Sequence, residues 1–442
     1  MLLELVYQIF PNRDLSDFNP ELSYSKHKSV DSKMIMGHLK SLVCCYKSKS
    51  PTNSNASGGV YCGDDEVSFS DFQILRAIGK GTFGKVCIVQ KVDTKKMYAM
   101  KYMSKQRCFK HSYLSNVIKE IDILKKLEHP FLVNLWYTFE DQEDIFMVVD
   151  LLMGGDLRYH IQNNIDFEEP LVKLYICELS LALDYLQKNR IIHRDVKPDN
   201  IILDEQGHVH LGDFNIAAEV KGSSELRSLS GTKPYMAPEI FKCALCEGCG
   251  YSYNVDWWSL GICAYEILYK KRPFEITSDM TIQQIYNVIQ TTEVAYFSYT
   301  KIGMINLMKK LLAFNPNERI HFLKMLKEQP YVNHMNFQAI YNKKIKPSFA
   351  PSKEQLNCDP TFELEEMIIE ANPLHKKKKR LAKQNLRKEL LEKRLSRVSN
   401  ESKHDSIHQD ELDRVLDTFT PFNRERRIEE KARRELKIIN EK

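Results

Sequence analysis

Two carboxylates, an amide and a lysine stand in the middle of the chain at spacings that suit phosphoryl transfer. The run is His193-Arg194-Asp195-Val196-Lys197-Pro198-Asp199-Asn200, and Asp213 follows eighteen residues after Asp195. Asp195 can accept the proton of an attacking hydroxyl, and Lys197 can meet the γ-phosphate. Asn200 and Asp213 offer the oxygen ligands that Mg²⁺ prefers. These residues therefore predict metal-assisted phosphoryl transfer, with Asp195 and Lys197 catalytic and Asn200 and Asp213 on the metal.

A glycine-rich run precedes this segment. It reads Gly79-Lys80-Gly81-Thr82-Phe83-Gly84-Lys85-Val86 and lies between two strand-like segments. Its glycines let the backbone approach phosphate oxygens closely and present N–H groups to them. Alone, the run fits a plain hairpin turn equally well. It is not a Walker A motif, and a strand follows it instead of the helix that a dinucleotide fold needs.

Two further charged pairs make the phosphate interpretation specific. Lys101, fifteen residues past the glycine-rich run, lies in a strand where its ammonium can reach the α- and β-phosphates. Glu120, on the next helix, is placed to pair with Lys101 and to act with it in catalysis. Further on, Ala237-Pro238-Glu239 closes a long loop, and Arg319 is available to pair with Glu239. Each residue alone fits a surface charge, but such motifs coincide by chance in fewer than about one sequence in a hundred.

The elements that must position these residues change type along the chain. Alternating and β-branched apolar residues predict strands at 72–78, 85–90, 97–103 and 145–151. One helical stretch, 114–127, interrupts the strands. After Gly154-Gly155 the spacing becomes helical, at 170–189, 256–269 and 302–313. The sequence therefore predicts an α+β fold with a strand-rich lobe at 72–150 and a helical lobe at 151–334.

The two ends of the chain differ from the middle. Residues 1–64 are polar and turn-rich, and predict a flexible leader before a catalytic domain at 65–335. Residues 336–442 predict a C-terminal tail, in which the segment 375–397 holds eleven Lys and Arg against two Asp and Glu. A solvated basic tail fits this segment, and its start, His375 to Arg380, fits a nuclear-localisation or acidic-lipid patch equally well.

Composition narrows the class of protein. Of 442 residues, 43% are hydrophobic, which is ample for a large core, and the net charge of +5 is small. Eleven cysteines lie scattered through segments that read as helix and strand, which predicts reduced thiols in a cytosolic or nuclear protein. No stretch approaches the ~18 apolar residues of a membrane helix. The opening apolar run lacks the basic start and cleavage site of a signal peptide.

Taken together, residues 70–334 resemble the eukaryotic protein kinase family. Lys197 and the run Gly231-Thr232-Lys233-Pro234-Tyr235 are similar to its serine/threonine branch. Four further runs of this sequence are similar to the AGC group of kinases. They are His129-Pro130-Phe131-Leu132-Val133, Asp150 to Asp156, Val255 to Gly261, and Asp359-Pro360-Thr361-Phe362. Two more runs resemble the YANK kinases, the serine/threonine kinase 32 family, and these are Asp213 to Ala218 and Leu356 to Lys383.

The resemblance implies a bilobal kinase fold and a serine/threonine protein kinase with protein substrates, ATP as co-substrate, and Mg²⁺ or Mn²⁺ as cofactor. It implies Val149 as gatekeeper of the adenine pocket, and the backbones of Asp150 and Leu152 as the groups that bind the adenine edge. An internal spine is implied for Leu124, Leu135, His193 and Phe214. The full implied ATP-binding set is Ile78, Gly79, Lys80, Gly81, Thr82, Phe83, Gly84, Val86, Ala99, Lys101, Val149, Asp150, Leu152, Asp156 and Ile202.

Regulation can also be placed through the resemblance. Ser228 stands where related kinases carry a phosphorylated residue, and Ser230 is its local competitor. Arg194 could pair with a phosphate on Ser228. Ser228 is therefore the expected phosphosite.

Two further features concern substrates and the tail. Asp156, Asp199 and Glu266 fall where AGC kinases place carboxylates around the peptide groove, which implies a preference for basic residues. Phe419 and Phe422 resemble the FxxF motif with which AGC kinases brace the small lobe. A tail segment that touches nothing fits the same four residues equally well.

Three features depart from the family pattern or are ambiguous. Asn215 replaces the usual glycine after the metal-binding Asp213, and Asn is the residue that best tolerates the left-handed backbone region. Cys243 to Cys249 has metal-like CxxCxxC spacing but no fourth ligand nearby, which favours a plain loop of thiols. Met36-Gly37 followed by Cys44-Cys45 fits a lipid-anchor signal only in a product that starts at Met36, and here it is internal.

The main alternative is a pseudokinase that binds nucleotide and acts as a scaffold. The residues that would discriminate, Lys101, Asp195, Asn200 and Asp213, are all present. We therefore expect an active, monomeric, cytoplasmic kinase with no nucleic-acid partner. The basic segment leaves open a nuclear fraction and weak contact with a membrane or acidic lipid.

Overall fold

The computed structural model describes most of the catalytic region and parts of the tail. The described residues are 67–80, 84–110, 113–220, 222, 225–246, 250–353, 357, 374–377, 379–380, 383 and 418–440. All of them belong to the compact unit Glu66–Lys442. The leader, Met36-Gly37, Cys44-Cys45 and Asp359 to Phe362 lie outside the described residues.

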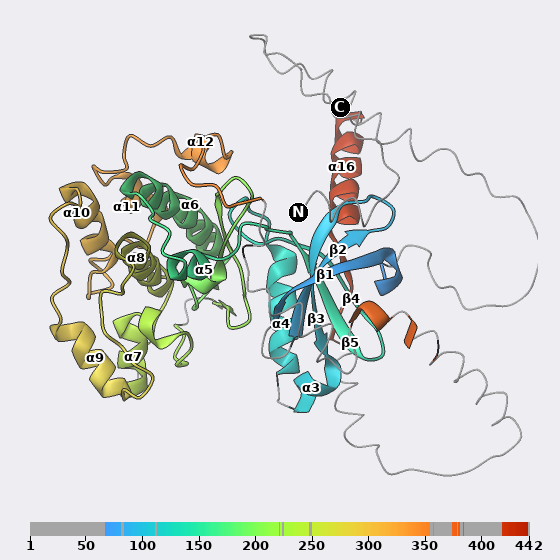
Figure 1. Ribbon diagram of the computed structural model, residues 1–442, viewed down its shortest axis with the longest axis horizontal. Coiled ribbons are helices and arrows are strands. Elements are labelled where there is room, and N and C mark those ends of the chain that lie inside the picture. Colours follow the sequence, from blue (N-terminus) through green and yellow to red (C-terminus); the bar gives the residue numbers. More distant parts are fainter. Residues whose placement is uncertain are drawn as a thin grey trace, which may run out of the picture. The chain divides into compact units, whose positions relative to one another are not determined.

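The first lobe is built on a six-stranded antiparallel sheet with the order β1-β2-β3-β5-β4-β10 (Figure 1). Its strands are β1 (Phe72–Lys80), β2 (Gly84–Lys91), β3 (Met97–Ser104), β4 (Leu135–Glu140), β5 (Asp144–Val149) and β10 (Phe422–Asn423). Alternate residues of these strands, such as Phe72, Tyr98 and Phe146, pack into an aromatic core of their own. The short 3₁₀ helix η1 (Phe69–Asp71) leads into β1.

Two helices follow β3 and lead towards β4. They are α3 (Lys105–Lys110) and α4 (Leu114–Lys126). In α4 the buried residues Val117, Ile121 and Leu124 recur every three or four positions, so one face of the helix packs into the core. That spacing puts Glu120 on the buried side as well, which positions its carboxylate for the site below.

The second lobe is helical, as the sequence predicted. Its longer helices are α6 (Glu169–Lys188), α8 (Asn254–Tyr269), α9 (Ile282–Thr291) and α10 (Ile302–Leu311). Shorter ones are α5 (Leu157–Gln162), η3 (Lys233–Tyr235), α7 (Pro238–Leu245), α11 (Leu323–Lys327) and α12 (Phe337–Tyr341). Helix α8 is buried along nearly its whole length, with Trp257 and Trp258 each 1% exposed, and packs against α6 and α10.

Two small antiparallel strand pairs hold the loops of the second lobe that carry the candidate site. β6 (Ile191–Ile192) pairs with β9 (Ala218–Glu219), and β7 (Ile201–Leu203) pairs with β8 (Val209–Leu211). The 3₁₀ helix η2 (Pro198–Asn200) runs directly into β7. These pairings place the 193–200 run and the 213–215 run next to each other, because each lies at the end of a paired strand.

The tail returns to the first lobe at two places. η5 (Leu374–Lys376) contacts β1, and β10 continues into α16 (Arg424–Asn440), which contacts β4 (Figure 1). Sequence patterning predicted neither β10 nor β4 as a strand. A two-residue strand such as β10 carries no periodicity, whereas β4 does bury alternate residues, Leu135, Tyr137 and Phe139, and the sequence analysis missed it.

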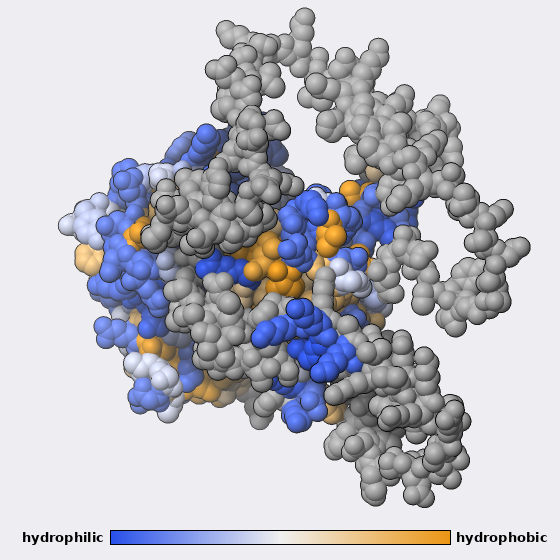
Figure 2. Space-filling view, turned by 45° about the vertical axis from the view of Figure 1, so that its right-hand side comes forward, coloured by the Kyte–Doolittle hydropathy of each residue, from blue (hydrophilic) through white to orange (hydrophobic). Residues whose placement is uncertain are grey.

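No helix among the described residues is long and apolar enough to cross a membrane. Figure 2 shows that hydrophobic residues gather in limited areas of this face, between hydrophilic ones. Among the described cysteines, Cys108, Cys177, Cys246 and Cys263 are free thiols, as predicted. In the CxxCxxC run, Cys243 lies in α7 and Cys246 is exposed, while Cys249 lies outside the described residues.

Candidate active site

Asp195 lies at the centre of a dense hydrogen-bond network. Its Oδ2 atom is 2.7 Å from Nζ of Lys197 and accepts a bond from Nδ2 of Asn200 at 3.0 Å. Its Oδ1 atom accepts bonds from the hydroxyl and the backbone N–H of Thr232, at 2.6 and 3.1 Å. Burial by itself raises the pKa of Asp195, but the bonds from Lys197 and Thr232 outweigh it and hold the pKa below its usual value. The carboxylate therefore stays ionised and can accept a proton from a substrate hydroxyl.

Asp256 of α8 fixes the loop that carries Asp195. Its two carboxylate oxygens accept bonds from the backbone N–H groups of His193 and Arg194, both at 2.8 Å. Arg194 adopts a left-handed backbone conformation with φ of 68°, which these two bonds hold in place. Sequence analysis quoted Asp256 within a family motif but gave it no role, because its partners lie some sixty residues away.

Lys101 joins three elements. Its Nζ lies 3.0 Å from Oε1 of Glu120 on α4 and 3.9 Å from Oδ1 of Asp213. Burial alone would lower the pKa of Lys101, but the charges of Glu120 and Asp213 hold it above its usual value. Burial raises the pKa of Glu120, and the charge of Lys101 acts against that rise. The pairing that the sequence predicted between Lys101 and Glu120 is therefore present, with Asp213 beside it.

The left-handed residue of the metal-binding run is Asp213 and not Asn215. Asp213 has φ of 58°, whereas Asn215 is absent from the described residues with positive φ. Asn215 instead directs Nδ2 to Oδ2 of Asp213 at 3.4 Å. The expectation that asparagine replaces glycine here for left-handed freedom is therefore wrong. Its side chain contacts the metal-binding carboxylate, which glycine could not do.

The residues implied for the adenine pocket line the junction of the two lobes. In the sheet Ala99 pairs with Val149, and Val86 pairs with Lys101, so these residues stand side by side on neighbouring strands. Ile202 lies in β7 and forms an isolated bridge with Asp156. Ile78 and Gly79 lie at the end of β1 and Gly84 at the start of β2, whereas Gly81, Thr82 and Phe83 lie outside the described residues. For Lys80 the structure describes only its place at the end of β1.

The implied spine residues pack as expected. Leu124 and Leu135 are buried in the same core as Phe214. The rings of His193 and Phe214 lie edge to face, 4.7 Å apart. Nε2 of His193 is within 2.9 Å of the carbonyl oxygen of Gly212, which ties the 193–200 loop to the segment that carries Asp213.

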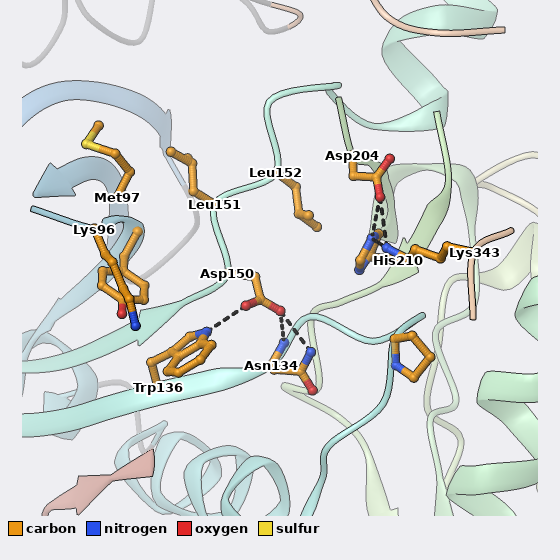
Figure 3. Close-up of a pocket in the computed structure, with 12 residues that line it drawn as sticks. Lys96, Met97, Asn134, Trp136, Asp150, Leu151, Leu152, Asp204, His210 and Lys343 are labelled. Carbon is orange, nitrogen blue, oxygen red and sulfur yellow. Dashed lines mark hydrogen bonds and ion pairs between the residues drawn. The ribbon is translucent and has the colours of Figure 1, made fainter. Parts of the chain in front are cut away.

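The side chain of Asp150 is held by hydrogen bonds to Asn134 and Trp136. Its Oδ1 accepts a bond from Nε1 of Trp136 at 2.6 Å, and its Oδ2 accepts two bonds from Asn134, both at 2.9 Å. Figure 3 shows these bonds at the edge of a pocket of about 590 Å³, which Leu152, Asp204, His210 and Lys343 also line. Because these bonds occupy its carboxylate, Asp150 can bind a nucleotide through its backbone, which is the role that the resemblance implies for both Asp150 and Leu152.

Comparison with known proteins decides the assignment. A model of the protein kinase domain matches residues 72–332. The chain belongs to the protein kinase family. It is similar to serine/threonine-protein kinase 32B of Homo sapiens, with 60% identity over 328 residues that cover 74% of this chain and 79% of the relative. Serine/threonine-protein kinase 32C of Homo sapiens is 53% identical over 367 residues, 83% of this chain and 74% of the relative.

A more distant relative indicates to which group of protein kinases the chain belongs. A cAMP-dependent protein kinase catalytic subunit from Arthrobotrys oligospora is 33% identical over 309 residues, which cover 69% of this chain and 58% of the relative. The kinase is therefore a serine/threonine protein kinase of the AGC group, most similar to the serine/threonine kinase 32 family, and it takes ATP as co-substrate. Nothing in these comparisons favours the pseudokinase alternative.

Asn200 and Asp213 of the kinase fit a divalent cation. The amide nitrogen of Asn200 donates to the carbonyl oxygen and to Oδ2 of Asp195, which leaves Oδ1 of the amide as the acceptor for a cation. The described residues contain no group of three or more His, Cys, Asp and Glu that could hold a metal. Two oxygen ligands completed by nucleotide phosphates are how proteins commonly bind Mg²⁺.

The segment between Asp213 and Glu239 is held at both ends. Nη1 and Nη2 of Arg319 pair with the two oxygens of Glu239 at 2.6 and 3.0 Å, and the guanidinium lies 5.0 Å from the Trp258 ring. This confirms the predicted Arg319–Glu239 pair. Within the segment, Nη1 of Arg194 donates to Oγ of Ser228 at 2.7 Å.

The three carboxylates expected around the peptide groove already have partners inside the kinase. Asp156 caps α5 by accepting a bond from the backbone N–H of Tyr159 at 2.7 Å. Arg158 pairs with Asp199 at 3.3 Å and with Glu266 at 3.0 Å. Sequence analysis gave Arg158 no role. The structure places its guanidinium between the two carboxylates that were expected to bind a basic substrate residue.

Proposed function

We propose that the kinase transfers the γ-phosphoryl group of ATP to serine and threonine hydroxyls with Mg²⁺, or Mn²⁺ in its place, bound by Asn200 and Asp213. The cation would neutralise charge on the phosphates. The observation that carries this proposal is the position of the Asp195 carboxylate, held by Thr232 and Lys197 beside the Asn200 amide. Asp195 orients the hydroxyl and takes its proton, while Lys101, held by Glu120, positions the α- and β-phosphates.

The kinase is proposed to act as a monomer in the cytoplasm. Support for a monomer comes from β10, which pairs with β4 and so covers one edge of the sheet with a segment of the same chain. The two edges of a sheet are where a second copy could add a strand.

Substrate choice is proposed to depend on Arg158. Because its guanidinium pairs with both Asp199 and Glu266, it would weaken the attraction of these carboxylates for an arginine of the substrate. In addition, Glu266 accepts a 2.6 Å bond from the hydroxyl of Tyr235. The expected preference for basic residues stays a prediction, and we propose that Arg158 makes it weaker.

A positional peptide library, phosphorylated with Mg²⁺ and ATP, tests this function and its specificity. We expect phosphorylation on serine and threonine, with no strong selection for arginine upstream of the site. Arg158→Ala should raise the relative rate on arginine-containing peptides by about tenfold, because two carboxylates lose their internal partner. Arg158→Lys, which keeps the positive charge, is the matched control and should stay near wild type. Strong arginine selection by the wild-type kinase would contradict the role of Arg158.

Phosphorylation of Ser228 is proposed to raise activity. A phosphate on its Oγ would meet Arg194, whose Nε donates to the carbonyl oxygen of Ile216 at 2.7 Å and so reaches the segment that follows Asp213. Ser228→Ala is expected to lower kcat several-fold, whereas Ser230→Ala, two residues further along, should have little effect. Mass spectrometry of the purified kinase gives the occupancy of both sites. If the purified kinase carries no phosphate on Ser228 and still phosphorylates its substrate at an undiminished rate, activation through Ser228 is contradicted.

A further inference from the structure

The start of the basic segment is docked on the first lobe. Leu374 is 2% exposed and belongs to the aromatic core of the sheet, and the 3₁₀ helix that it begins contacts β1. In Figure 1 this helix is the orange segment drawn beside β4 and β5. A purely solvated tail, one of the two interpretations of the sequence, does not describe these residues.

Lys377 is the centre of the contact. Its side chain is 0% exposed, and its Nζ lies 2.9 Å from Oδ2 of Asp141, 3.7 Å from Oε2 of Glu143 and within ion-pair distance of Oδ2 of Asp144. The same ammonium lies 4.9 Å from the ring centre of Phe146 and 5.9 Å from that of Phe69. Three carboxylates and two rings thus surround one lysine.

The turn between β4 and β5 is shaped for this lysine. Oδ1 of Asp141 accepts bonds from the backbone N–H groups of Glu143 and Asp144, both at 2.9 Å, which folds the acidic residues around one point. An ammonium without partners is rarely buried, because its desolvation is so unfavourable. Complete burial of Lys377 therefore indicates a site in which carboxylates and π-faces replace its water shell.

Docking changes the charge that the segment presents. Lys377 and Arg380, which pairs with Glu143 at 3.0 Å, bring two positive charges to three carboxylates of the turn. The charges of these two residues are therefore compensated locally and add little to the positive charge that the rest of the segment presents. A basic cluster attracts an anionic lipid surface only when its charges face that surface without nearby carboxylates.

We propose that the first lobe binds its own basic segment through Lys377 and thereby withholds that segment from anionic membranes. The acidic–aromatic site, made by Asp141, Glu143, Asp144, Phe69 and Phe146, takes the lysine side chain as its ligand. Contact with an acidic membrane then requires the segment to leave this site. The inference is independent of catalysis, since none of these residues touches the ATP site described above.

Release of the segment can be measured by trypsin, which cuts after lysine and arginine. The release variant is Asp141→Asn with Asp144→Asn in the full chain, which leaves every basic residue in place. We expect cleavage after residues 376–380 to be at least about tenfold faster in this variant, relative to cleavage after the exposed Lys344 and Lys353. Asp166→Asn, which removes an exposed carboxylate of the second lobe, is the control and should leave the cleavage rate unchanged. Equal cleavage in the wild type and the release variant would overturn the docking.

Membrane contact is measured by co-sedimentation with vesicles of phosphatidylserine and phosphatidylcholine. The release variant should bind about tenfold more tightly than the wild type, because two further basic residues near an anionic surface become available. Adding Lys376→Gln, Lys379→Gln and Arg380→Gln to the release variant should remove the gain. Equal vesicle binding by the wild type and the release variant would contradict the proposal that docking keeps the basic segment from anionic membranes. If the double variant unfolds, Asp141→Asn alone, on the more exposed carboxylate, provides the milder release.

Discussion

Asp213→Ala is expected to leave a folded kinase whose kcat is lowered about a thousandfold or more. In the proposed mechanism Asp213 provides one of the two side-chain oxygen groups for the cation, and its Oδ1 atom lies 3.9 Å from Nζ of Lys101. Without it, the phosphates lose both the metal and the residue that aligns it, and preorganised charge of this kind dominates phosphoryl transfer. Thermal unfolding should change little, because this carboxylate is partly exposed and buries little surface.

Lys101→Met should give a similar loss for a different reason. The methionine keeps the length and the apolar stem of the side chain but removes the ammonium that Glu120 holds. Lys188→Met, on an exposed lysine at the end of α6, is the matched control and should keep full activity. Phosphate incorporation into a serine peptide measures both variants. Activity of either active-site variant within a few-fold of the wild type would refute the mechanism.

The residues that perform chemistry could be predicted because chemistry restricts their type and spacing. Asp195, Lys197 and Asn200 lie within six consecutive residues, so local geometry brings them together in any chain that folds this way. Lys101 and Glu120 lie on neighbouring elements, and the alternation of the strand and the helical repeat of α4 fix the faces on which they stand.

Residues that act through distant partners could not be predicted. Arg158 meets Glu266 across 108 residues, and Lys377 meets Asp144 across 233. No periodicity or spacing encodes such a contact, because the fold as a whole determines which side chains converge. The expected basic preference stays a prediction for this reason: the sequence showed three carboxylates, but not the arginine that lies between two of them.

The backbone conformation around Asp213 also could not be predicted from the sequence. Sequence analysis assigned left-handed freedom to position 215 by analogy with glycine, whereas the structure has the positive φ at Asp213. A residue type indicates which conformations are tolerated, but hydrogen bonds to neighbouring segments decide which residue adopts them.

The tail motif was left open between docking and a free segment, and the structure places it on the first lobe. Phe419 is 9% exposed within the core, and Phe422 pairs with Thr138 in the sheet. Arg424 follows, 4% exposed, and its Nη2 donates to the carbonyl oxygen of Leu127 at 2.7 Å, just past the end of α4. Two rings and a buried guanidinium therefore attach the tail beside the helix that carries Glu120.

Replacing Phe419 and Phe422 with alanine should lower thermal stability and kcat together. Truncating a buried phenyl ring typically costs about 3 kcal/mol or more, and a half-buried ring less, so we expect Tm to fall by roughly 5–10 °C. The fall in kcat should be several-fold, because α4 loses a contact that holds Glu120 against Lys101. Ile428→Ala, on an exposed position of α16, is the matched control and should change neither quantity. If Tm falls while kcat stays at the wild-type value, the tail stabilises the lobe without positioning Glu120. If neither changes, the tail in solution does not occupy this place.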